Sequence, residues 1–271
     1  MELNFFNVDQ LCSSATLIDD SLQVDLSRVS FFRPFALVYL GMFLRHHTSC
    51  GTSCTLIHPN SPVSRNYLAR QNFWERFNFD PDTIKEENLR RFTTSTSFNN
   101  IVDIEKREYV AEDIADAVKG ILRRNLVRVN TAEIEVVVCE LVENFARHSE
   151  RTLAAFHMQY YPTKKHLVLA IGDCGVGIRA SLATNPKYKT LMKRPHCEAA
   201  LKSFEPLITR LSEGGGGTGL TDVKDVVTRL NGMLKLATGD GYVTITDEGV
   251  HYGQMDYDLP GVQMELLFPE V

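Results

Sequence analysis

The chain has 271 residues, of which 44% are hydrophobic and 23% charged, and its formal net charge is −5. These fractions are close to the globular average, so they exclude a disordered chain and a fibrous repeat. The acidic balance gives no overall attraction for nucleic acid, and we do not expect nucleic acid as a partner. A chain of this length has room for two domains.

No apolar run approaches the roughly 18 residues that span a bilayer. The longest run, over residues 34–44, is typical of a helix buried in a protein core. Residues 1–11 contain no Lys or Arg and so lack the basic region of a secretory signal. We therefore expect a cytoplasmic protein with no membrane partner and with reduced cysteines. Cys50, Cys54 and His58 are an incomplete ligand set for zinc, so we favour ordinary buried thiols there.

Strand and helix patterns alternate near the N-terminus. Residues 21–26 place apolar side chains at every second position, as in a half-buried strand. A helix is predicted from Pro34, with a broad apolar surface that must face a sheet. A short strand over residues 54–57 and a second helix over residues 63–73 complete the pattern.

A polar connector follows over residues 80–100, and we place a domain boundary near residue 95. Beyond it, apolar residues recur at helical spacing from Val110 to Leu122. The sequence therefore predicts an amphipathic helix at the start of a second domain.

A further helix is predicted from Thr131, which we take as its N-cap. Glu140, Asn144 and His148 are spaced four residues apart, so they lie along one side of this helix. A carboxylate there can deprotonate a water or hydroxyl, an amide oxygen can coordinate Mg²⁺, and a histidine can reach a phosphate. Taken alone, such a stripe is more typical of a solvated helix face.

The apolar strand predicted over residues 167–171 leads directly into Asp173, Gly175 and Gly177. Glycines let the backbone approach a flat ring closely, and a buried carboxylate can accept a hydrogen bond from an exocyclic amine such as adenine N6. An ordinary turn is the alternative explanation for this motif.

A glycine-rich run opens the next amphipathic helix, predicted over residues 221–230. Free N–H groups and the helix dipole favour an anion there, so the run is typical of a phosphate cradle, with a flexible linker as the alternative. Its candidate residues are Gly215, Gly216, Gly217, Thr218, Gly219 and Leu220.

These three segments, in this order, resemble the N, G1 and G2 boxes of the GHKL superfamily, which includes gyrase, histidine kinases and MutL. The resemblance extends over the chain beyond residue 105, including a last strand over residues 261–269 that is similar to the end of histidine kinase domains. It implies an α+β sandwich, the Bergerat ATP-binding fold, over residues 96–271, with ATP and Mg²⁺ as cofactors. Val262 stands where the family has a threonine that helps to hold adenine.

By this resemblance Glu140 would be the general base, Asn144 the Mg²⁺ ligand and Asp173 the reader of adenine. The glycine run would hold the phosphates. Residues 179–213 would form a lid, whose basic residues are candidates for a contact with the γ-phosphate or, equally, a solvated loop. These basic residues are Lys187, Lys189, Lys193 and Arg194.

The N-terminal segment resembles a STAS domain, the fold of the antagonists that bind anti-sigma factors. Residues 24–31 and 56–60, which precede the two predicted helices, carry this resemblance. It implies an α/β domain over residues 1–95. Such antagonists carry a phosphorylated Ser or Thr at the start of the first helix, where this chain has Arg33, Pro34 and Phe35. A fused scaffold or dimerisation domain is therefore favoured over a phospho-switch.

Three functions fit this combination. The first is a serine/threonine protein kinase of the anti-sigma-factor type, acting on a regulatory protein partner. The second is an ATP-hydrolysing conformational switch, as in chaperone and MutL relatives, and the third is an ATP sensor without turnover. No histidine-bearing dimerisation helix precedes the ATP domain, which argues against a sensor histidine kinase. The resemblance also leaves a homodimer open.

Overall fold

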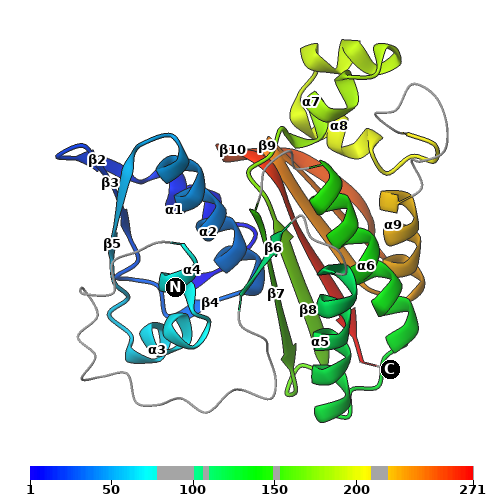
Figure 1. Ribbon diagram of the computed structural model, residues 1–271, viewed down its shortest axis with the longest axis horizontal. Helices are drawn as coiled ribbons and strands as arrows, with labels where there is room; N and C mark the ends of the chain where they lie inside the picture. The colour runs from blue at the N-terminus through cyan, green and yellow to red at the C-terminus, as the bar shows by residue number, and fades with distance from the viewer. Residues whose placement is uncertain (78–100, 106–109, 149–152, 209–218, 271) are drawn as a thin grey trace.

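The computed structural model describes residues 1–77, 101–105, 110–148, 153–208 and 219–270 and has a mixed α/β fold (Figure 1). Its largest sheet is five-stranded and antiparallel, in the order β6-β7-β8-β10-β9. The strands are β6 (Val102–Glu105), β7 (Leu153–Tyr161), β8 (His166–Gly172), β9 (Met233–Thr246) and β10 (Gly249–Pro269). Because β9 lies beyond β10, the chain crosses over after β8 and returns at the sheet edge.

Helices α5 (Val110–Arg124), α6 (Thr131–His148) and α9 (Gly219–Arg229) cover one face of this sheet (Figure 1). Their apolar stripes form a core with the side chains that β7, β8, β9 and β10 direct to that face. The predicted helices and the predicted strand over residues 167–171 are confirmed. The predicted N-cap was wrong, because Thr131 is already helical and the side chain of Asn130 accepts the N–H of Glu133 at 3.3 Å.

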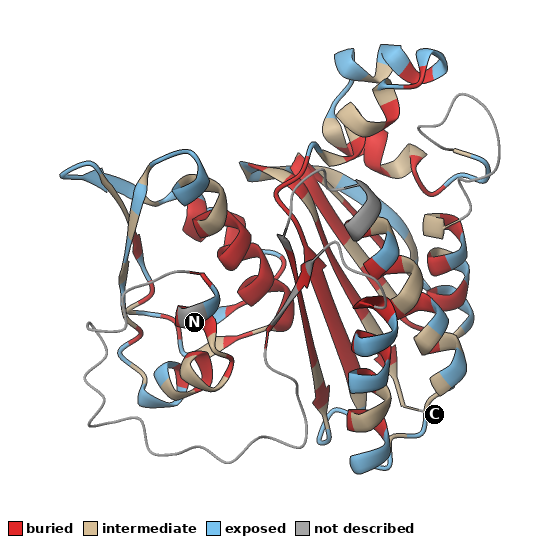
Figure 2. Ribbon diagram, viewed as in Figure 1, coloured by how far each residue is buried: buried red, intermediate tan, exposed pale blue. Residues whose placement is uncertain are grey.

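The opposite face is covered by α2 (Pro34–Ser49), as Figures 1 and 2 show. Every residue of α2 from Pro34 to Leu44 is buried, because the helix packs against the five-stranded sheet and also against the N-terminal elements. The sheet admits such a bulky helix because it presents small side chains to it. These include Ala155, Ala170 and Ala237.

The N-terminal elements follow the predicted alternation. Strand β3 (Ser21–Asp25) pairs in parallel with β5 (Ser53–Ile57), and α2 connects them. Helix α3 (Pro62–Arg70) follows, and the side chain of Ser61 accepts the N–H of Ser64 at its start. Among these N-terminal elements, five were not predicted from the sequence. They are β1 (Glu2–Leu3), α1 (Val8–Ser13), β2 (Thr16–Ile18), β4 (Phe31–Phe32) and α4 (Phe73–Arg76).

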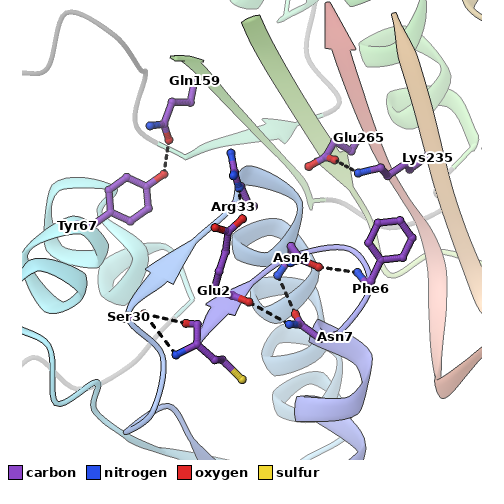
Figure 3. A network of polar contacts seen from close by, with 11 residues as sticks. Glu2, Asn4, Phe6, Asn7, Ser30, Arg33, Tyr67, Gln159, Lys235 and Glu265 are labelled. Carbon is purple, nitrogen blue, oxygen red and sulfur yellow. Dashed lines mark hydrogen bonds and ion pairs between the residues drawn. The ribbon is translucent and has the colours of Figure 1, made fainter. Parts of the chain in front are cut away.

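The predicted boundary near residue 95 lies outside the described residues. In the described part, the N-terminal core includes residues of β7, β8 and β9, so both halves of the chain share it. Polar contacts join the halves too: the hydroxyl of Tyr67 donates to Oε1 of Gln159 at 2.6 Å (Figure 3). The ammonium group of Lys235 lies over the ring of Phe6. It forms a largely buried ion pair with Glu265 at 2.9 Å (Figure 3).

The contact between α2 and Phe77 generates a stability prediction. A Cβ at Gly41 would lie 2.1 Å from Cζ of Phe77, so Gly41→Ala should lower the free energy of unfolding by about 1–3 kcal/mol. Gly120→Ala in α5 is the control, since its Cβ would meet only the end of the Arg124 side chain at 3.4 Å. That change should raise stability by about 0.5–1 kcal/mol. Denaturant unfolding that moves both variants in the same direction would contradict this account.

Candidate nucleotide site

The start of α9 lies against the polar stripe of α6. A Cβ at Gly219 would lie 2.0 Å from Oε1 of Glu140 and 2.8 Å from Nδ2 of Asn144. A side chain at this position would displace the ends of the Glu140 and Asn144 side chains, so the glycine allows this close contact. Within α6, Nδ2 of Asn144 donates to Oε1 of Glu140 at 2.9 Å. Three of the predicted site residues, Glu140, Asn144 and Gly219, are therefore neighbours.

The electrostatics of this contact bear on what can bind. Glu140 and Asn144 are both half-buried, and the carboxylate of Glu140 lies at the positive end of α9. Because Asn144 uses its amide nitrogen on Glu140, its carbonyl oxygen is the atom suited to a hard cation. An anion brought to α9 would meet the Glu140 carboxylate, so a divalent cation would have to offset the repulsion.

Asp173 follows β8 and has only 4% of its surface exposed. Its Oδ1 accepts the N–H of Gly175 at 2.5 Å, and its own N–H donates to the carbonyl of Val262 at 2.9 Å. Burial raises the pKa of the Asp173 carboxyl to about 7, although backbone hydrogen bonds to the carboxyl from Gly175 and Val262 act in the opposite direction. The carboxyl therefore changes protonation state near neutral pH.

Two glycines allow close packing of the backbone around Asp173 and Thr238. Gly261, at φ +94°, would place a Cβ 2.6 Å from Oδ1 of Asp173. Gly177, at φ +73°, would place a Cβ 3.0 Å from Oγ1 of Thr238 and starts α7 (Gly177–Ala183). Both conformations are in the left-handed region that favours glycine. The loop after β8 is therefore held tightly against β9 and β10.

A cavity of about 170 Å³ adjoins this loop. Val176 and Gly177 form one side, and the ends of β9 and β10 form another. Met192 of the 3₁₀ helix η3 (Pro186–Lys193) and His196 of α8 (His196–Lys202) close it. Its described lining contains the G1-box backbone and part of the predicted lid but none of the three polar site residues Glu140, Asn144 and Asp173.

The other predicted site residues belong to the first turn of α9, the end of α6, the glycine run and the predicted lid. Leu220 is half-buried in the first turn of α9. His148 is the last residue of α6, and its side chain lies outside the described part of the chain. Gly215, Gly216, Gly217 and Thr218 also lie outside the described residues. The basic residues of the predicted lid, Lys187, Lys189, Lys193 and Arg194, are all exposed.

The structure adds two polar residues that the sequence did not single out. Thr238, 2% exposed, accepts the N–H of Ile178 at 3.2 Å and donates to the carbonyl of Gly261 at 2.8 Å. Gln263 is fully buried, and its Nε2 donates to the carbonyl of Asp173 at 2.9 Å. Both strands contain other polar residues, such as Lys235 and Glu265, so the sequence pattern does not single these two out.

Comparisons with known proteins do not assign this site to a family. No protein-family model matches the sequence, and a comparison with curated proteins finds no significant match. Among the described residues, no helix has the length and hydropathy needed to cross a membrane. The same residues contain no cluster of three or more His, Cys, Asp or Glu arranged for a metal ion.

The raised pKa of Asp173 predicts a pH-dependent stability in the nucleotide-free protein. The folded state holds a proton up to a pH of about 7, whereas an unfolded Asp releases it near about 3.9. The free energy of unfolding should therefore fall as pH rises between these values, by an amount on the order of 4 kcal/mol. Asp173→Asn should remove this loss, measured by denaturant unfolding at pH 5 and pH 8.

The exposed turn variant Asp247→Asn is the control, and it should keep the pH dependence of the wild type. An Asp173→Asn protein that loses as much stability as the wild type between the two pH values would show that this carboxyl is not the responsible group.

Proposed function

We propose that this chain binds Mg·ATP between α6 and the start of α9 and is a GHKL-type protein kinase with an N-terminal STAS-like segment. One observation carries the proposal, namely the contact of Gly219 with Glu140 and Asn144. It brings a glycine-led helix start, an amide oxygen and a carboxylate to one place, which is what binding of a magnesium–phosphate group requires.

The position of Asp173 supports adenine as the base. A buried carboxyl at the end of a strand has few uses in a fold, since burial of a carboxylate is costly. Here it lies against the backbone, since its Oδ1 accepts the N–H of Gly175 and a Cβ at Gly261 would lie 2.6 Å from that oxygen. Val262 offers no hydroxyl, and the buried hydroxyl of Thr238 lies nearby on β9, bonded to the carbonyl of Gly261.

Glu140 would act as general base for an acceptor hydroxyl of a serine or threonine on a cytoplasmic protein partner. It would take the proton as the hydroxyl oxygen attacks the γ-phosphorus and ADP leaves. Mg²⁺ would offset the charge of the phosphates. The N-terminal segment supports the pairing with a STAS-like module, because its parallel strands β3 and β5 are connected through α2.

Nucleotide binding is the first test. Asp173→Asn and Asn144→Ala should each weaken Mg·ATP binding at least tenfold, or about 1.4 kcal/mol, because one loses the base acceptor and the other a cation ligand. Isothermal titration with and without Mg²⁺ measures this effect. Glu143→Gln, exposed on the same helix, is the matched control and should bind as the wild type does. Unchanged affinities in both site variants would refute the site.

The reaction is tested separately with γ-labelled ATP and candidate regulatory proteins. A kinase should transfer label to Ser or Thr of a partner, and Glu140→Ala should reduce this transfer at least a hundredfold, as expected for loss of a general base. Release of free phosphate without protein labelling would identify an ATPase switch. Binding without either product, unchanged in Glu140→Ala, would identify a sensor.

A further inference from the structure

Gly172 is the last residue of β8, and it and the two residues that follow face alternate sides of the sheet. A Cβ at Gly172 would meet Val38 and Met42 of α2 and, on β10, Cγ of Gln263 at 3.1 Å. The thiol of Cys174 donates to the carbonyl of Met42 at 3.1 Å, also on the α2 side. Asp173, between them, therefore faces the opposite side, the one covered by α6. The short segment 172–174 therefore contacts α2 and also carries the carboxyl of Asp173.

Helix α2 holds this piece tightly. The Cβ of an alanine at 172 would lie 2.8 Å from Cγ1 of Val38, closer than real side chains approach. Val38 and Met42 are one helical turn apart, so they contact the strand end at two neighbouring points. A shift of α2 toward or away from the sheet would therefore move residues 172–174 together.

The carboxyl of Asp173 is tied to its own backbone, because its Oδ1 accepts the N–H of Gly175, two residues further along the chain. Its carbonyl is held by Gln263, and its pKa is set by burial and by backbone groups at Gly175 and Val262. In the described residues no charged side chain contributes to that shift. The contacts of Gly172 and Cys174 with α2 and the hydrogen bond from Gln263 are therefore the side-chain restraints on the backbone at Asp173.

We propose that α2 is a positioning element for the base site, so that Val38 and Met42 of the N-terminal segment set the base selectivity of the nucleotide site. This inference rests on the proposed ATP site. The carboxylate of Asp173 accepts a hydrogen bond from the exocyclic amine of adenine, whereas guanine presents a carbonyl oxygen at that position. A displaced carboxylate loses this discrimination, while a general loss of stability weakens ATP and GTP binding alike.

The test is a compensating pair of substitutions. Gly172→Ala should push the strand end away from α2, lower ATP affinity about tenfold and lower the ratio of ATP to GTP affinity. Adding Val38→Ala removes the nearest atom that the new Cβ meets, so the double variant should recover most of both quantities. Adding Val137→Ala instead, an equally buried change on α6, should not restore them.

The pKa of Asp173 can be measured without nucleotide, so it tests the role of α2 independently of ATP binding. The Asp173 carboxyl, titrated by carbon-13 NMR, should have its raised pKa in the wild type, a lower pKa in Gly172→Ala, and a restored pKa in the double variant. If the wild type binds no ATP, the proposed function is refuted. The pKa of Asp173 in the three proteins then still tests whether α2 positions this carboxyl. Recovery with Val137→Ala, or none with Val38→Ala, overturns the role of α2.

If Gly172→Ala does not fold, Cys174→Ala and Cys174→Ser give the same comparison. The alanine removes the donor to the Met42 carbonyl, whereas the serine keeps one. The ATP to GTP ratio should fall in the alanine variant and be retained in the serine variant. Equal ratios in the two variants would overturn the proposal.

Discussion

The close approach of α2 to the five-stranded sheet is the constraint on which the arrangement of the molecule depends. Small residues, including Ala155, Ala170 and Gly172, leave room for a helix that is apolar on all sides. Such a helix has no face for water, so it needs apolar neighbours all around it. The five-stranded sheet covers one side of α2 and the N-terminal elements cover the other. The N-terminal segment is therefore in direct contact with β8, the strand that leads into Asp173.

The opposite face of the sheet has a different chemistry because two carboxyl groups there are in unlike environments. Glu140 is half-buried at the start of α9, where an anion is favoured. Asp173 is almost wholly buried, and the resulting rise of its pKa keeps it neutral for part of the time near pH 7. Under the proposed function, the first would serve as the base and the cation site and the second would accept a hydrogen bond from the amine of adenine.

The helices α2, α3, α5, α6 and α9, the strands β3, β5 and β8, the end of β10 and the spacing of Glu140 and Asn144 could be predicted from the sequence because periodicity is local. The strands β7 and β9 and the helices α7 and α8 were not predicted. The contact between Gly219 and Glu140 was expected only through a family resemblance, since no spacing along the chain reveals it. Thr238 and Gln263 were not found, because their roles depend on the register of β8, β9 and β10. The N-cap of α6 was misplaced by one residue, since Asn130 and Thr131 are both suitable caps.

The apolar run over residues 34–44 is an example in which the local pattern predicts the helix but not its packing partner. Its composition predicts a buried helix that must face a sheet, and this was correct, but the pattern contains no information on which sheet. A run without a polar face needs partners on more than one side, and the short β3–β5 sheet alone cannot supply them. A distant sheet with a small-residue face was therefore the missing partner. That same packing is what brings Val38 and Met42 behind the candidate base site.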